Sequence, residues 1–149
     1  MNNSTLGLLI GGLIPALFYG LSAIAMKAGA GFKVSTSNYM MIIGVVIFLT
    51  GLAIKPWLGN TEYDGLNLKA IAIVVASGLF WALGTTLVNF AIVKFDSPIA
   101  LLTPLYNMNT LVAVLGGMIL FAEWKTVNSL PVFIGTALVV CGGILLSRA

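Results

Sequence analysis

Long apolar stretches separated by short polar connections make up most of this 149-residue chain. A helix needs about 20 predominantly apolar residues to cross a hydrocarbon core about 30 Å thick. The pattern therefore predicts an all-α integral membrane protein, organised as a single transmembrane domain over residues 1–149. Its five transmembrane helices are expected at about residues 6–26, 38–57, 69–93, 99–121 and 130–146.

The composition points the same way. Hydrophobic residues make up 60% of the chain and charged residues 7%, with a mean hydropathy of +1.10, whereas soluble domains carry about 25% charged residues. A water-soluble fold would lack the polar surface to cover itself, so we expect a multi-pass protein of the inner (plasma) membrane, in contact with the lipid bilayer. No Lys or Arg precedes the first apolar run, which we expect to be retained rather than cleaved as a signal peptide.

Several kinds of chemistry are disfavoured. The chain has no histidine and one cysteine, Cys141, and none of its carboxylates falls in the middle of an apolar stretch. General acid–base catalysis and thiolate-rich zinc sites lack their usual residues, so we predict no enzyme activity, no catalytic residue, no metal and no cofactor. The seven Lys and Arg residues are scattered, which gives no indication of nucleic-acid binding.

Polar side chains interrupt the fourth apolar stretch near its middle. Thr103, Tyr106, Asn107 and Thr110 follow an i, i+3, i+4, i+7 pattern, which places them on one face of a helix. Pro104 lacks a backbone donor and is expected to open the helix locally. Polar groups at this depth are costly unless they face protein, water or a ligand. The cluster favours the floor of a transport pathway, while interhelical hydrogen bonding remains the alternative for each residue.

A second polar stripe lies on the third helix, where Ser77, Trp81, Thr85 and Asn89 recur every four residues. Trp81 falls near the middle of the span, although tryptophan in membrane proteins prefers the interfaces. Packing against a neighbouring helix is the alternative for Trp81, but its alignment with hydroxyl and amide side chains favours the pathway. Tyr19 of the first helix is a further candidate. The predicted substrate-binding residues are Tyr19, Trp81, Thr85, Asn89, Thr103, Tyr106, Asn107 and Thr110.

The second half of the chain resembles an EamA repeat of the drug/metabolite transporter superfamily. The similarity rests on the following segments: Ala82-Leu83-Gly84 to Asp96-Ser97-Pro98, Leu102-Thr103-Pro104, Glu123, Ile134-Gly135 and Cys141-Gly142-Gly143. The segment from Phe18-Tyr19-Gly20 to Met26-Lys27 is similar to the family's first helix. The resemblance covers most of the chain and is weakest in the second helix.

The resemblance implies one five-helix, inverted-repeat unit of a ten-helix transporter assembly, with a substrate cavity between two such units. Glu123 matches the family's acidic residue after the fourth helix, although its spacing to Gly135 is stretched. The chain lacks the first-helix carboxylate of small multidrug resistance pumps, so their proton exchange is not implied.

The leading functional hypothesis is a transporter of a small neutral or zwitterionic polar metabolite, a sugar or an amino acid, by alternating access. Aromatic walls with a few amides suit such substrates, and the absence of a charged residue at mid-depth disfavours organic ions. The alternatives are a non-transporting membrane subunit and a half-transporter that needs a separately encoded inverted partner.

An antiparallel homodimer with dual topology is the expected assembly. An odd number of helices puts the termini on opposite sides, and inverted repeats around a midplane site recur among transporters. Three cations fall on the N-terminal side and four on the other, which is too small a bias to fix the orientation. They are Lys55, Lys69 and Lys125 against Lys27, Lys33, Lys94 and Arg148.

Overall fold

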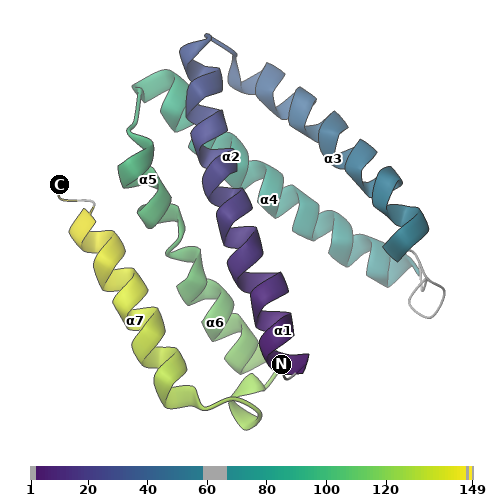
Figure 1. The fold of residues 1–149 in the computed structure, drawn as a ribbon, viewed down its shortest axis with the longest axis vertical. Coiled ribbons are helices and arrows are strands. Elements are labelled where there is room, and N and C mark those ends of the chain that lie inside the picture. The colour runs from purple at the N-terminus through teal and green to yellow at the C-terminus, as the bar shows by residue number, and fades with distance from the viewer. Residues whose placement is uncertain (1–2, 59–66, 147, 149) are drawn as a thin grey trace. The chain divides into compact units, whose positions relative to one another are not determined.

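A computed structural model describes residues 3–58, 67–146 and 148, and its elements in the described residues are helical (Figure 1). Within these residues, five spans are long and apolar enough to cross a membrane, which confirms the predicted all-α membrane fold. The elements are α1 (Asn3–Leu8), η1 (Leu9–Leu13), α2 (Ile14–Gly31), α3 (Thr36–Leu58), α4 (Leu68–Phe95), α5 (Ile99–Tyr106), α6 (Asn109–Leu120), η2 (Glu123–Lys125) and α7 (Ser129–Leu146).

The chain divides into two compact units, residues 1–96 and 97–149. Unit 1 holds α1, η1, α2, α3 and α4, and unit 2 holds α5, α6, η2 and α7. Each unit is described by itself, and the expected single transmembrane domain stays a prediction.

The first span of unit 1 contains a wide turn. Residues Leu9–Leu13 form a π-helix, in which the Ile14 N–H donates to the Leu9 carbonyl five residues back. Pro15 follows directly and cannot donate a backbone hydrogen bond. Because a proline removes one rung of the α-helical ladder, the turn before it is free to widen.

The first span is longer than the sequence predicted. It was expected to end at about residue 26, but α2 continues to Gly31, so Lys27 belongs to the helix rather than to a loop. The Val34 N–H donates to the Gly29 carbonyl and the Lys33 N–H to the Ala30 carbonyl. With Lys33 at a φ of 60°, this is a Schellman motif. Lys27 and the alanines that follow favour helix, so the helix ends where this motif closes it.

The other two spans of unit 1 begin at side-chain caps. The Asn38 N–H donates to Ser35 Oγ (3.2 Å) at the start of α3, and the Ala70 N–H donates to Asn67 Oδ1 (2.9 Å) at the start of α4. Such caps satisfy backbone donors that the first helical turn leaves open. Most of the polar loop predicted at residues 58–68 lies outside the described residues. Within unit 1, α2 and α3 each pack against α4.

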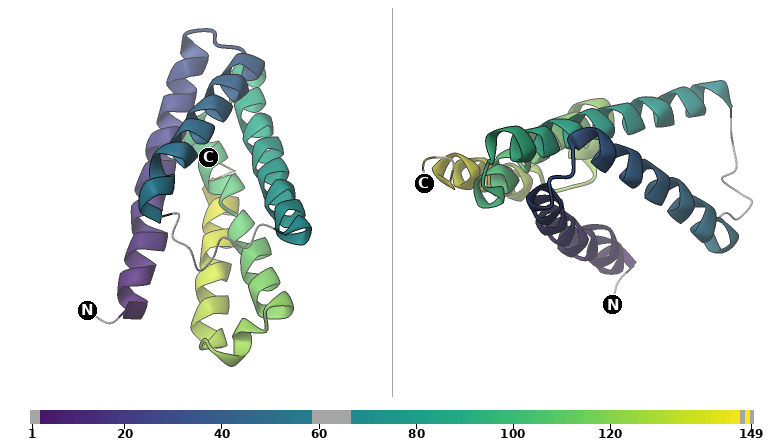
Figure 2. Two further views of the ribbon diagram at one scale, coloured as in Figure 1. Left: turned by 90° about the vertical axis from the view of Figure 1, so that its right-hand side faces the viewer. Right: turned by 90° about the horizontal axis from the view of Figure 1, so that it is seen from above.

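Unit 2 is a helical hairpin in which one arm is broken. α5 and α6 follow each other along one arm, and α7 returns beside both of them (Figure 2). The span expected as one helix over residues 99–121 is therefore two helices, with a turn at Asn107 and Met108. The break follows Pro104, where local opening was predicted.

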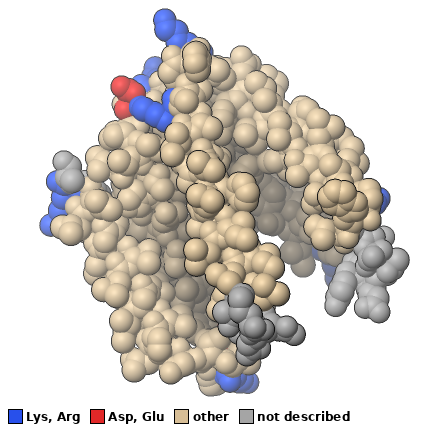
Figure 3. Space-filling model, in the orientation of Figure 1, with Lys and Arg blue, Asp and Glu red and all other residues tan. Residues whose placement is uncertain are grey.

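The described side chains leave most apolar surface uncovered. Large apolar residues are exposed on every long helix. Figure 3 shows that, in this view, the charged side chains lie at the edges and the surface between them is uncharged. Lipid tails can cover such a surface, whereas water would not be tolerated over so large an apolar area.

Candidate functional site

The break in the fourth span is the main irregularity of unit 2, and it lies near the middle of the membrane-crossing stretch Ile99–Leu120. The N–H groups of Met108, Thr110 and Leu111 each donate to a carbonyl three residues back, rather than four. Hydrogen bonds of this tighter type close the turn. Irregular backbone at membrane depth occurs where it is buried in protein or lines a water-filled cavity.

The polar residues of the fourth span surround this break. The Tyr106 hydroxyl donates to Thr103 Oγ1 at 3.4 Å, and the Thr110 hydroxyl donates to the Asn107 backbone carbonyl at 2.8 Å. The expectation of one continuous helix over residues 99–121 is wrong, because a turn at Asn107 and Met108 separates α5 from α6. The structure instead places Thr103 and Tyr106 on α5, and Thr110 on α6.

A glycine of α7 packs closely against the break. A Cβ atom at Gly143 would lie 3.0 Å from the Pro104 carbonyl oxygen and 3.3 Å from Met108 Cγ. A Cβ atom at the neighbouring Gly142 would meet nothing within 4 Å. Gly143 therefore lets α7 approach the broken backbone, as small residues do at membrane helix contacts.

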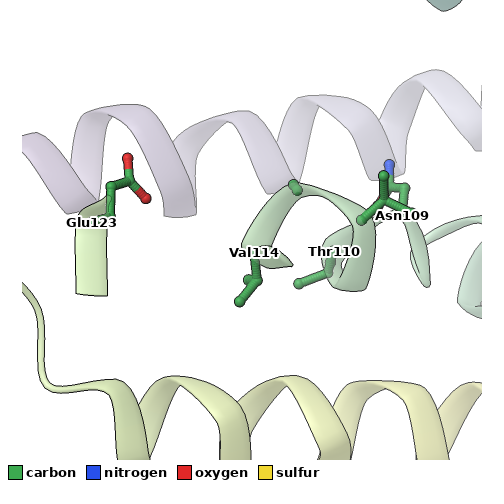
Figure 4. A pocket seen from close by; sticks show the side chains of 6 residues that line it. Asn109, Thr110, Val114 and Glu123 are labelled. Atoms are coloured by element: carbon green, nitrogen blue, oxygen red, sulfur yellow. The ribbon is translucent and has the colours of Figure 1, made fainter. Parts of the chain in front are cut away.

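An open hollow of about 650 Å³ runs along α6. Its lining combines an amide, a hydroxyl and a carboxylate with three small apolar side chains, and consists of Asn109, Thr110, Val112, Ala113, Val114 and Glu123. Figure 4 shows Asn109 and Glu123 toward its two ends, with Thr110 and Val114 between them. The hollow therefore leads from the break at mid-depth to the end of the span.

The sequence reasoning did not select Asn109 or Glu123 as site residues. Asn109 flanks the helical face on which the prediction was built. In the structure it is the first residue of α6, directly after the break, and its side chain lines the hollow. Glu123 follows the span by three residues, and its carboxylate lies against Gly117 of α6. The contact is so close that a Cβ atom at Gly117 would overlap Glu123 Oε2. The resemblance of Glu123 to the acidic residue after the fourth helix of an EamA repeat was the signal that could have identified it.

The four candidates of unit 1 lie on two helices. Tyr19 belongs to α2, while Trp81, Thr85 and Asn89 lie on the uninterrupted α4. Tyr19 is 68% exposed and Trp81 is 48% exposed, whereas Thr85 is half-buried. Nothing in the structure tests the substrate-binding role of these residues, which stays a prediction.

Asn89 differs from its neighbours in being buried. Its side chain is 1% exposed, and its carboxamide oxygen has no hydrogen-bond partner among the described residues. Buried polar atoms nearly always have a partner, and leaving one unpaired costs about 1–3 kcal/mol. A hydroxyl or amine donor would satisfy this oxygen.

An ion pair joins two helix ends of unit 1. Lys27 Nζ lies 2.5 Å from Asp96 Oδ1 and 3.4 Å from the Asp96 backbone carbonyl. Asp96 ends α4 in the left-handed conformation, with a φ of 49°. The hydrogen bond from Lys27, together with its positive charge, holds the pKa of the Asp96 carboxyl below its usual value. The pair thus links the ends of α2 and α4.

Comparison with known proteins gives a distant likeness. No family model and no solved structure matches the chain, so the resemblance to an EamA repeat stays a prediction. The chain is similar to lin0215 of Listeria innocua and lmo0176 of Listeria monocytogenes, each named as a proposed sugar uptake protein. Each is 30% identical over 122 residues, which cover 80% of this chain and 40% of the relative. The chain thus spans about 40% of the length of the curated relatives that it matches.

Proposed function

We propose that this chain is a transport unit for a neutral sugar. The observation that carries the proposal is the helix break at Asn107 and Met108, at mid-depth in an apolar span. Transporters commonly bind their substrates near the bilayer midplane at discontinuous helices of this kind. The names of the two relatives support a sugar as the substrate class.

The available polar groups suit a sugar. Amides, hydroxyls and aromatic rings recognise an uncharged polyol through hydrogen bonds and apolar contact. In unit 2, Asn107 and Thr110 supply polar groups at the break. In unit 1, we predict that the unpaired carboxamide oxygen of Asn89 acts as an acceptor for a sugar hydroxyl. Trp81 and Tyr106 provide aromatic surface.

We further propose that two inverted copies form the working transporter by alternating access. The 122 matched residues are 40% of each relative, so each relative has about 300 residues and accommodates a second segment of similar size. A polar break is costly when it faces lipid, and an inverted second copy covers it. A separately encoded inverted partner is the rival arrangement.

A sugar screen tests the proposed function. A ligand that binds only the folded protein raises its melting temperature, so the purified protein is heated with a panel of neutral hexoses, pentoses and amino acids. Sugars that stabilise it are then tested for flux into proteoliposomes. Stabilisation and flux with neutral sugars are expected, whereas no flux with any of them would favour the non-transporting subunit.

Paired variants separate binding from helix association. Asn89→Leu is expected to remove sugar binding, because it deletes the acceptor. Thr50→Val is the control, since the Thr50 hydroxyl donates to the Val46 carbonyl of its own helix at 2.8 Å. If Asn89→Leu binds sugar like the wild type, Asn89 has no part in recognition. If it only prevents folding, the hydrogen-bonding role within the helix bundle is the better account.

A further inference from the structure

Glu123 brings a negative charge into an otherwise uncharged hollow. The other five lining residues, Asn109 to Val114 without Leu111, carry amide, hydroxyl or apolar side chains. The carboxylate folds back along α6, since a Cβ atom at Gly117 would lie 3.2 Å from Glu123 Cδ. The carboxylate therefore lies close to Gly117 at one end of the hollow, while Glu123 remains exposed.

No cation neutralises this carboxylate among the described residues. The nearest basic residue in sequence is Lys125, and its Nζ lies 5.3 Å from the centroid of the Trp124 ring. The salt bridge recorded in the described part of the chain joins Lys27 to Asp96, in unit 1. The hollow of unit 2 therefore has, at the end of the span, a carboxylate with no salt-bridge partner among the described residues.

We propose that Glu123 makes this end of the hollow a charge-selective entrance, so that neutral and positively charged sugars are admitted in preference to anionic sugars. The inference rests on the proposed sugar transport and narrows its substrate class. A carboxylate at the mouth of a cleft raises the local concentration of cations and lowers that of anions. For a solute charge about 7 Å away in a water-like medium, the expected bias is about threefold per unit charge.

The experiment uses the full chain in proteoliposomes. Glucose, glucosamine and glucuronate share a pyranose ring and differ in charge, and the readout is the ratio of inhibition constants for glucuronate and glucosamine against the uptake of labelled glucose. The wild type is expected to prefer glucosamine by about tenfold. In Glu123→Gln the ratio falls close to one, in Glu123→Lys it inverts, and in Glu123→Asp it persists.

A control and a salt series complete the design. Asp96→Asn removes a carboxylate outside the hollow and is expected to leave the ratio unchanged. Raising the ionic strength from about 0.1 M to about 1 M shortens the screening length from about 10 Å to about 3 Å, which reduces the wild-type ratio. This measurement needs no variant, and a wild-type ratio independent of salt overturns the proposal even if Glu123→Gln does not fold.

The remaining outcomes separate this inference from the proposed function. Glucose uptake with an unchanged ratio in folded Glu123→Gln overturns charge selection and leaves sugar transport intact. Loss of all glucose uptake in folded Glu123→Gln also overturns it, because Glu123 would then act directly in transport. The absence of uptake of any neutral sugar by the wild type removes the proposed function itself.

Discussion

Substitution of Gly143 by alanine probes the packing of α7 on the broken span. The new methyl group would lie 3.0 Å from the Pro104 carbonyl oxygen, a backbone atom, and 3.3 Å from Met108 Cγ. Overpacking of this kind costs about 1–3 kcal/mol. Replacing a helical glycine by alanine otherwise gains about 1 kcal/mol. The net free energy of unfolding is thus expected to change by between zero and about −2 kcal/mol.

Gly142→Ala provides a matched control on the same helix. Its methyl group meets nothing within 4 Å, so this variant has the same gain in helix propensity without the clash. The free energy of unfolding of Gly143→Ala is therefore expected to be about 1–3 kcal/mol lower than that of Gly142→Ala, measured by denaturant titration in detergent micelles. Equal stabilities of the two variants would show that α7 does not approach the break as closely as the structure indicates. We also expect slower transport in Gly143→Ala, because the break must shift to make room.

Three further predictions concern binding, pH and topology. Asn107→Leu and Trp81→Ala should each lower sugar flux at least about fivefold while the protein remains folded, because the loss of a ligand contact costs about 1–3 kcal/mol. Normal flux in both variants would refute the pathway. The pKa of Asp96 is lowered in the folded state, so its contribution to stability is complete above the ordinary Asp pKa and is lost as the pH falls through the lower folded value. Comparison of wild type with Asp96→Asn in thermal melts between pH 7 and pH 3 should show this loss in the wild type alone. Single cysteines are placed at Ser35 and at Asn60, which lies outside the described residues, in a cysteine-free background. Each should be labelled partly from both sides of intact cells, and labelling from one side only would exclude dual topology.

The number of spans and their approximate positions could be predicted because membrane crossing depends on local apolar content and length. The same holds for the opening after Pro104, since a missing backbone donor acts within one turn. The end of the first helix was harder to predict. From the sequence, the helix was expected to end before Lys27. The Schellman motif that ends it depends on the left-handed backbone conformation of Lys33, which the local composition does not predict.

The candidate site could be predicted in part. Polar residues at mid-depth are visible in the sequence because burying them in lipid is costly, and this selected Asn107, Thr110 and Asn89. The sequence did not indicate that the Asn89 oxygen is buried without a partner, since burial depends on what packs against α4. Asn109, which lines the hollow, was not selected because it flanks the helical face on which the prediction was built.

The sequence by itself determined the all-α membrane fold, the five spans found in the described residues and the polar groups at mid-depth, because these properties follow from residue type and local spacing. The tertiary structure decided which of those groups come together. Glu123 lies against Gly117, Gly143 against Pro104, and Lys27 against Asp96. Each of these contacts depends on how the backbone ends, breaks or folds back between the two residues, and a periodic pattern along one helix carries no information about that geometry.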